Sequence, residues 1–361
     1  MRNRTTGALT ITLLASLIVA APATTAGATS EPLTTAAANV ISKPLAATQP
    51  AAAEIATFWL ADGGANLTAA TPYNVRTSTS KLLDGGGATP DTKPGTIPPS
   101  LPATTSTAAA VTPATSGKVF FLGADGLPHW CTGTAVHSQY RNVVATAAHC
   151  GFDIQRTGYA LDKWAFVPAY TNGTAPLGLY VGRQLYGHYD FDAYGDFDRG
   201  YAFITVYEGV APSATGEPVN FGRLGDNAGG QGLAWNQPVD SATDVFGYPA
   251  GPHPDGTLPY TGDTLESSSG RPTSVQVPSL KGEELLGVGS PFTGEGALGS
   301  SWLLRYDKAT GQGYLNGVTI SVTDRDADLR FDTSMSPYFD GETRSVYTAA
   351  ATQWTGAVLP T

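Results

Sequence analysis

Positive charge and long apolar runs are both scarce in this chain. Lys and Arg number 20 against 30 Asp and Glu, which gives a formal net charge of −10. Nucleic-acid binding needs clustered Lys and Arg, so a nucleic-acid partner is excluded. The longest apolar run, residues 8–21, is shorter than the ~20 residues that cross a bilayer. The sequence therefore predicts no association with a membrane.

The same apolar run lies close to the start of the chain, where short apolar runs often belong to export signals. Arg2 and Arg4 precede it, and the small residues Ala26-Gly27-Ala28 follow it. Such an order is typical of a secretory signal peptide. We therefore predict a signal peptide over residues 1–28 and a secreted, extracellular protein, which could also be associated with the cell wall.

Cysteine is scarce as well, with two residues in the whole sequence. No cluster of cysteine and histidine has the spacing of a zinc site. In an exported chain two cysteines are expected to form a disulfide, because oxidising compartments favour that bond. We predict a Cys131–Cys150 disulfide, whose loop closure contributes roughly 3 kcal/mol. We predict no metal site and no cofactor.

Residues 29–116 are rich in Ala, Thr and Pro. A segment of this composition buries too little apolar surface to offset the entropy lost on ordering. We predict a mostly disordered pro-segment or linker, in which the apolar island Ile55–Leu60 could dock as an element of a pro-segment. The alternative is a cell-wall spacer with an incidental apolar patch.

Residues 117–361 change to short β-like runs separated by Gly, Pro and Asn. Such runs in one stretch of this length predict a single all-β domain, a barrel or a sandwich. At the end of the chain, apolar residues at helical spacing over 344–354 predict a C-terminal helix, with Trp354 as an anchor in the core. The predicted strands are 118–122, 143–146, 164–167, 201–206, 245–248, 302–306 and 318–322.

Several ordered motifs support a known family. The segment Thr146-Ala147-Ala148-His149-Cys150 follows a strand, and Cys131-Thr132-Gly133-Thr134 precedes it. The chain resembles the secreted trypsin-like and glutamyl-endopeptidase-like serine peptidases of actinobacteria, within the chymotrypsin family (peptidase S1, PA clan). The resemblance implies a chymotrypsin-like fold of two six-stranded β-barrels with a C-terminal helix. Further matching motifs are Gly117–Phe121, Phe246–Ala250, Trp302–Arg305, Leu315–Val318 and Ser336–Phe339.

The resemblance also implies catalytic roles. A serine peptidase needs a nucleophilic hydroxyl, an imidazole base, a carboxylate that orients the base, and backbone donors for the oxyanion. His149 corresponds to the base, and Asp198, just before an apolar strand, to the carboxylate, with Asp196 as its competitor. The acidic run 190–196 beside it and a second run at 324–328 lack the ligand spacing of a calcium loop, so we predict no calcium site there.

The segment that should hold the nucleophile departs from the family pattern. Counting back four positions from Trp302 gives Leu298 where the reactive serine is expected. A leucine removes the oxygen, and loss of the nucleophile lowers turnover by about 10⁶-fold. Ser300 or Ser301 could replace it only if the loop were shifted. Ser290 is less suitable, because the proline after it lacks an N–H donor.

The sequence thus predicts a pseudoprotease, a peptidase homologue that is inactive or impaired and that keeps His149 and Asp198. By resemblance, residues Asn316, Gly317 and Val318 belong to the strand whose edge pairs with an extended peptide. We expect a monomer whose partner is a peptide or protein. The alternatives are an active endopeptidase that uses Ser300 or Ser301, and a cell-surface binding or adhesin-like protein.

Overall fold

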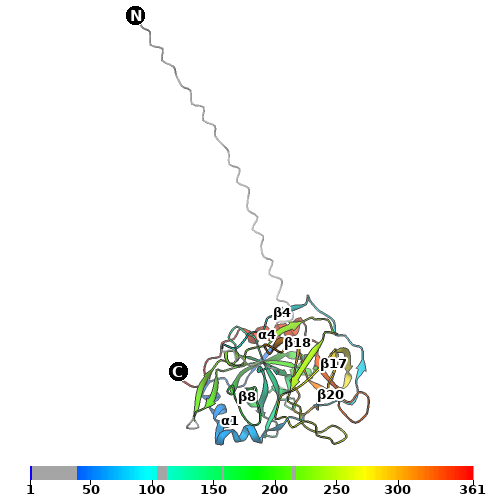
Figure 1. Cartoon of the computed structure of the whole chain (residues 1–361), viewed down its shortest axis with the longest axis horizontal. Coiled ribbons are helices and arrows are strands. Elements are labelled where there is room, and N and C mark those ends of the chain that lie inside the picture. The colour runs from blue at the N-terminus through cyan, green and yellow to red at the C-terminus, as the bar shows by residue number, and fades with distance from the viewer. Residues whose placement is uncertain (2–38, 104–111, 157, 214–216, 361) are drawn as a thin grey trace. The chain divides into compact units, whose positions relative to one another are not determined.

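A computed structural model describes residues 1, 39–103, 112–156, 158–213 and 217–360 (Figure 1). Apart from Met1, the predicted signal peptide lies outside these residues. Residues 39–360 belong to one compact unit. No helix in the described ranges has the length and apolar character needed to cross a membrane.

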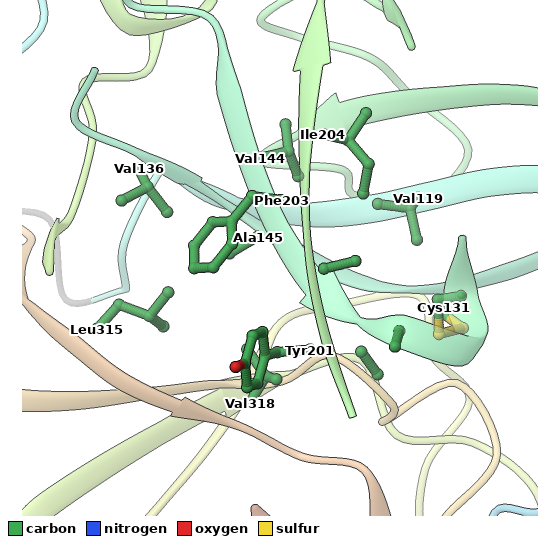
Figure 2. Close-up of a cluster of buried hydrophobic side chains, with 14 of the residues drawn as sticks. Val119, Cys131, Val136, Val144, Ala145, Tyr201, Phe203, Ile204, Leu315 and Val318 are labelled. Carbon is green, nitrogen blue, oxygen red and sulfur yellow. A yellow bond between two sulfur atoms is a disulfide. The ribbon is translucent and has the colours of Figure 1, made fainter. Parts of the chain in front are cut away.

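A closed six-stranded barrel forms the first half of the predicted all-β domain. Its strands pair in the order β9-β10-β7-β6-β5-β8, and β8 pairs with β9 to close it. Valine and aromatic side chains fill its interior, and Leu315 and Val318 from the second half pack against them (Figure 2). The strands are β5 (Ser116–Leu122), β6 (Pro128–Val136), β7 (Val143–Ala147), β8 (Asp162–Pro168), β9 (Tyr180–His188) and β10 (Tyr201–Val206).

Two further sheets form a half-barrel. One has the order β15-β14-β18-β19-β13-β4, and the other β20-β21-β17-β16-β3. The first contains β4 (Gly95–Ile97), β13 (Gly232–Trp235), β14 (Thr243–Gly247), β15 (Glu266–Gly270), β18 (Ser301–Asp307) and β19 (Gln312–Val318). The second contains β3 (Leu83–Asp84), β16 (Thr273–Val277), β17 (Gly282–Gly289), β20 (Ser321–Thr323) and β21 (Thr333–Pro337). A separate ribbon joins β11 (Gly209–Pro212) to β12 (Pro218–Gly222).

The predicted all-β class is confirmed, and one predicted strand is divided. The run 318–322 is interrupted between β19 and β20, at Thr319 and Ile320. There the backbone of Thr319 exchanges hydrogen bonds with another loop: its carbonyl accepts from Gly299 N–H at 2.7 Å, and its N–H donates to Ser300 at 2.9 Å. The chain therefore leaves its sheet to hold the loop that contains Leu298.

The segment before the barrel is ordered over residues 39–103, so the prediction of a mostly disordered segment is wrong there. β1 (Val40–Pro44) pairs with β9, and β2 (Thr71–Pro72) pairs with β6. Between them, α1 (Gln49–Ala69) packs on the barrel through Trp59, which is fully buried and whose indole N–H donates to Lys163 O at 2.6 Å. The amino-acid composition gave a wrong prediction because strands of the barrel supply the pairing and packing partners that the segment itself lacks.

The predicted C-terminal helix is confirmed, with shifted ends. α4 (Gly341–Ala351) begins with a capping box between Asp340 and Thr343 and buries Val346 and Tyr347. The prediction of Trp354 as a core anchor is wrong, since it lies beyond the helix and is 48% exposed. The remaining short helices are η1 (Ala148–Cys150), α2 (Tyr189–Tyr194), η2 (Phe197–Arg199), α3 (Leu224–Asn227) and η3 (Pro278–Leu280).

Candidate functional site

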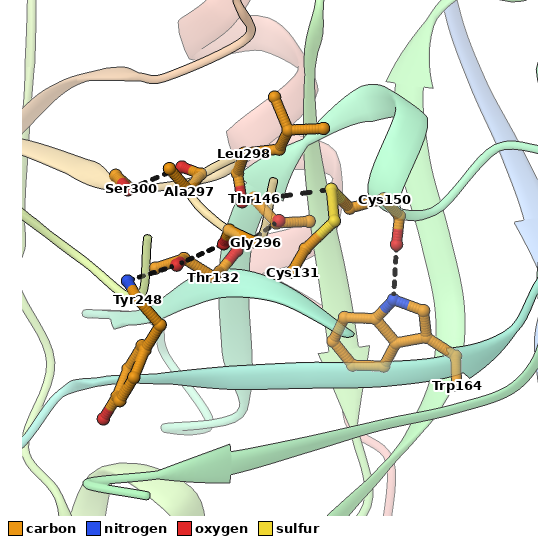
Figure 3. The surroundings of a disulfide bond; sticks show 10 residues. All are labelled: Cys131, Thr132, Thr146, Cys150, Trp164, Tyr248, Gly296, Ala297, Leu298 and Ser300. Atoms are coloured by element: carbon orange, nitrogen blue, oxygen red, sulfur yellow. Dashed lines mark hydrogen bonds between the residues drawn. A yellow bond between two sulfur atoms is a disulfide. The ribbon is translucent and has the colours of Figure 1, made fainter. Parts of the chain in front are cut away.

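The predicted disulfide is present and fixes the segment that carries His149 (Figure 3). Cys131 lies in β6 and Cys150 ends η1, the short helix that follows β7. The indole N–H of Trp164 donates to Cys150 O at 2.9 Å. The bridge and this hydrogen bond hold both sides of the turn, so the backbone position of His149 is set by its neighbours.

The His149 side chain has no polar partner in the described part of the chain. It is 0% exposed, and neither Nδ1 nor Nε2 makes a hydrogen bond there. Its ring lies 5.6 Å from the ring of Phe197, measured between centroids. Burial, assisted by the positive charge of Arg76, lowers the pKa of His149 to about 3. The imidazole is therefore neutral and lacks a group that orients it.

Asp198 is committed to other groups. Its Oδ2 accepts from the N–H of Glu283 at 2.9 Å and its Oδ1 from the N–H of Glu284 at 2.8 Å. Burial raises its pKa to about 6, although these two donors favour the charged form. Asp196, the competitor, caps η2 by accepting from Asp198 N–H. The structure thus places Asp198 in η2, beside the His149 turn, but forms no hydrogen bond between the two side chains.

The residue that adjoins the histidine turn is Gly200, which no motif in the sequence indicated. Its carbonyl accepts from Ala148 N–H at 2.8 Å, directly before His149. A Cβ built on Gly200 would lie 2.9 Å from Phe197 O and 3.1 Å from Cγ2 of Ile320. Glycine is therefore required by packing here. The place next to the histidine turn carries no side chain, and an isoleucine methyl lies against it.

Leu298 lies in a tight turn that packs on β6. Its carbonyl accepts from Thr132 N–H at 2.9 Å, and Thr132 Oγ1 donates to Gly296 O at 2.9 Å (Figure 3). Gly296 and Gly299 adopt φ of +72° and +84°, a conformation that favours glycine. The Leu298 side chain is 0% exposed and belongs to the same hydrophobic cluster as Ala148 and Phe197. The turn is thus well formed, with a leucine at its centre.

The two candidate replacement serines are buried and turned to other partners. The Ser300 hydroxyl donates to Ala297 O, and a Cβ on Gly247 would lie 1.8 Å from its oxygen. Ser301 opens β18, and its hydroxyl is buried without a partner in the described ranges. The Ser290 hydroxyl pairs with that of Ser268 at 2.9 Å. None of them forms a hydrogen bond with a nitrogen of His149.

The residues predicted to pair with a peptide belong to β19; β18 pairs with them on one side, and their pairing with a peptide stays a prediction. Gly317 pairs with Trp302 of β18, and the Asn316 side chain donates to Ala234 O at 3.1 Å. In the described structure β20 accepts an extended segment of the chain at its edge. Its Val322 bonds a segment that we call the strap, residues 71–79, which also reaches the N–H of Gly296. No local signal in the sequence marks the strap, because its partners, from His129 to Val322, all lie more than 50 residues away.

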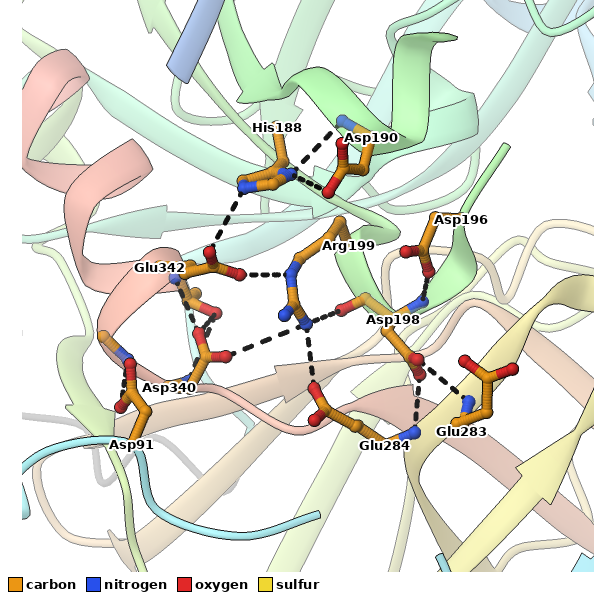
Figure 4. A network of polar contacts seen from close by, with 12 residues as sticks. Asp91, His188, Asp190, Asp196, Asp198, Arg199, Glu283, Glu284, Asp340 and Glu342 are labelled. Carbon is orange, nitrogen blue, oxygen red and sulfur yellow. Dashed lines mark hydrogen bonds and ion pairs between the residues drawn. The ribbon is translucent and has the colours of Figure 1, made fainter. Parts of the chain in front are cut away.

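A network of charges joins η2 to α4 and β17 (Figure 4). Arg199 contacts Glu342 at 2.5 Å and Glu284 at 3.1 Å. His188 and Arg199 together lower the pKa of Glu342 to about 2, and burial raises that of Asp340. The network holds the elements around Asp198 together. It forms no bond to His149, so its role here is to fix the packing of η2.

Three carboxylates approach one another on an exposed loop. Asp324, Asp326 and Asp332 each offer an oxygen within 4.8 Å of the others. Backbone N–H groups already bind them, among them that of Arg325 to Asp332 at 3.2 Å. The acidic run 324–328 contains the first two of them, and Asp332 lies outside that run. Such loops are common without an ion, and this one adds nothing to the site around His149.

Comparison with known proteins identifies the fold. Over 68% of its length the chain matches 99% of the protease Anisep from Arthrobacter nicotinovorans, with a TM-score of 0.55 and 26% identity. Over 67% of its length it matches all of the thermostable serine protease AL20 from an extremophilic microorganism, with a TM-score of 0.53 and 26% identity. No protein-family model matches the chain, and no curated protein matches its sequence. The chymotrypsin-like fold predicted from the motifs is confirmed.

Proposed function

We propose that this chain, which has the fold of chymotrypsin-type serine proteases, is a secreted homologue that does not cleave peptides but binds them. The observation that carries the proposal is the state of His149. It is fully buried and its ring nitrogens have no partner in the described structure, while Leu298 occupies the turn that should present a hydroxyl. In domain terms, residues 1–28 are a signal peptide and residues 117–361 the protease-like domain.

Each part of the catalytic apparatus has a physical reason to fail. A nucleophile needs an oxygen that a base can deprotonate, and Leu298 has none. A base needs a carboxylate that fixes its tautomer, and Asp198 instead accepts two backbone N–H groups at 2.9 and 2.8 Å. A leucine at the nucleophile position alone lowers turnover by about 10⁶-fold. Residual hydrolysis is therefore expected to be negligible.

Peptide binding requires main-chain hydrogen-bonding groups at a strand edge but no nucleophile or base, and the chain has such groups. An extended peptide binds a β-protein by adding main-chain hydrogen bonds to a strand edge. Val322 offers both its N–H and its carbonyl in this way, and each bonds the strap at 3.0 Å. Gly296 offers a further N–H, two residues before Leu298, where proteases of this fold bind a carbonyl oxygen. These groups support a peptide or protein as the partner.

A fluorophosphonate probe tests the loss of activity, because it labels a serine only when a base and backbone donors activate it. We expect no labelling of the wild-type chain, both as it stands and with the strap displaced by Thr79→Pro, while an active trypsin-type protease is labelled in parallel. Labelling that disappears in Ser300→Ala or Ser301→Ala would overturn the proposal in favour of a relocated nucleophile.

A further inference from the structure

The strap, residues 71–79, contacts β6 in the first half of the protease-like domain and β20 and Gly294–Gly296 in the second, and we call the surface that these elements offer it the groove. Its first part follows β6: Thr71 and Pro72 pair with His129 and Trp130, and Tyr73 N–H donates to Trp130 O at 2.9 Å. Its last part follows β20: Val322 N–H donates to Thr77 O and Thr79 N–H donates to Val322 O, both at 3.0 Å. The strap therefore bridges the first barrel and the second.

Between these ends the strap uses the turn that precedes Leu298. Gly296 N–H donates to the carbonyl of Tyr73 at 3.4 Å. In a protease of this fold the corresponding N–H binds the carbonyl oxygen of the peptide under attack. A carbonyl of the chain's own backbone thus lies at the place where a bound peptide would put one.

The side chains of the strap are also accommodated. The Tyr73 ring packs edge-on against Phe121 at 5.0 Å and lies 5.8 Å from the ring of His129, and Tyr73 is only 3% exposed. Arg76 lines two hollows of about 220 and 390 Å³. The groove therefore holds an aromatic side chain tightly and leaves free space around a basic one.

One glycine of the groove leaves room for the strap. A Cβ on Gly294 would lie 2.6 Å from the carbonyl oxygen of Thr77, 2.8 Å from Thr77 Cβ and 3.0 Å from Cγ2 of Val322. Gly294 does not need a left-handed conformation, because its φ is not positive. The close approach of the strap is what a side chain at this position would prevent. An alanine there is therefore a specific means of blocking the groove.

From these contacts we infer that the strap is a built-in ligand of the peptide groove. The external ligand is then an extended peptide that displaces the strap, pairs with Val322 through its main chain and places an aromatic side chain against Phe121 and His129. The inference rests on the proposed function and specifies its ligand. It also makes the strap autoinhibitory, since an external peptide must compete with a segment tethered at an effective concentration in the millimolar range.

A displacement experiment on the full chain tests this inference. Tyr73→Ala with Thr79→Pro removes the anchoring ring and the N–H that bonds Val322, while the groove itself stays intact. The probe is a fluorescein-labelled peptide with the sequence of residues 69–80, followed by anisotropy. We expect it to bind the opened chain at least tenfold more tightly than the wild type, because the competitor is gone.

Two alanine substitutions in the opened chain give matched controls. Gly294→Ala should abolish peptide binding, since its Cβ occupies the path of the strap. Gly289→Ala, where a Cβ would meet nothing within 4 Å, should leave binding unchanged. If the opened chain is folded and binds the peptide no more tightly than the wild type, the inference is wrong. The absence of fluorophosphonate labelling would stand independently of that result.

Hydrogen exchange tests the same contact without an added peptide. In Thr79→Pro we expect the amide of Val322 to exchange at least tenfold faster than in the wild type, because the strap no longer covers it. Ser80→Pro is the control, since no described residue accepts a hydrogen bond from the N–H of Ser80. Unchanged protection of Val322 in Thr79→Pro would refute the role of the strap.

Discussion

Replacement of Lys118 by methionine should change how the stability of the protein depends on pH. Lys118 lies in β5 and is only 3% exposed. Its ammonium faces the rings of Trp130 at 3.6 Å, Tyr170 at 4.2 Å and Tyr248 at 5.7 Å. Burial lowers its pKa from 10.5 to about 7, and the negative charge of Asp263 opposes this change.

The sign of the effect follows from proton binding. Between pH 7 and pH 10.5 the unfolded chain holds a proton on Lys118 that the folded chain releases, so stability rises with pH in this window. The full difference of about 3.5 pKa units corresponds to roughly 5 kcal/mol. From pH 7 to pH 9, below the titration of tyrosines, the gain is about 2 kcal/mol. Attraction between the ammonium and the rings makes this an upper value.

Urea unfolding at pH 7, 8 and 9, followed by tryptophan fluorescence, measures the slope. We expect the wild type to gain stability over this range and Lys118→Met to gain about 2 kcal/mol less, with its advantage largest at pH 7. Lys308→Met, at an exposed lysine, is the control and should follow the wild type. If Lys118→Met and the wild type show the same slope, the amine is not held uncharged by burial.

Two further substitutions test the packing of the site and of the N-terminal helix. Leu298→Ala should lower the free energy of unfolding by about 2–5 kcal/mol, because it empties a fully buried position; a loss below 1 kcal/mol would show that the turn is not packed as described. Trp59→Ala should cost about 3–5 kcal/mol and make α1 sensitive to limited proteolysis, whereas unchanged resistance would show that α1 is held without it.

The parts of the molecule that the sequence predicted well depend on short-range patterns. Alternating apolar runs located the strands of the barrel, and the segment around His149 located the disulfide. In both cases the information lies within about twenty residues. The C-terminal helix followed from spacing, but its end did not, because Trp354 continues the apolar pattern after the helix has stopped. Periodicity alone does not distinguish a buried position from an exposed one beyond the cap.

The parts that were missed depend on long-range contacts. The order of residues 39–103 comes from pairing with β6 and β9, which no composition argument includes. Asp198 forms no hydrogen bond with His149 in the structure, and the reason is local: β10 begins at Tyr201, and the Asp198 carboxylate in η2 accepts from the N–H groups of Glu283 and Glu284. A shift of one or two residues reverses the direction of a side chain near a strand. The spacing of residues along the chain therefore could not determine which way the Asp198 side chain points.

The changes around His149 support one another physically. Leu298 brings carbon to the turn where a hydroxyl is expected, Gly200 adjoins the histidine without a carboxylate, and the methyl of Ile320 lies 3.1 Å from where its Cβ would be. A buried imidazole without partners costs about 1–3 kcal/mol, and apolar packing around it offsets part of that cost. A serine introduced at position 298 would therefore still lack a carboxylate that orients the His149 ring. His149 and Leu298 are thus part of the buried core, while the strand edge at Val322 offers its N–H and carbonyl to the strap.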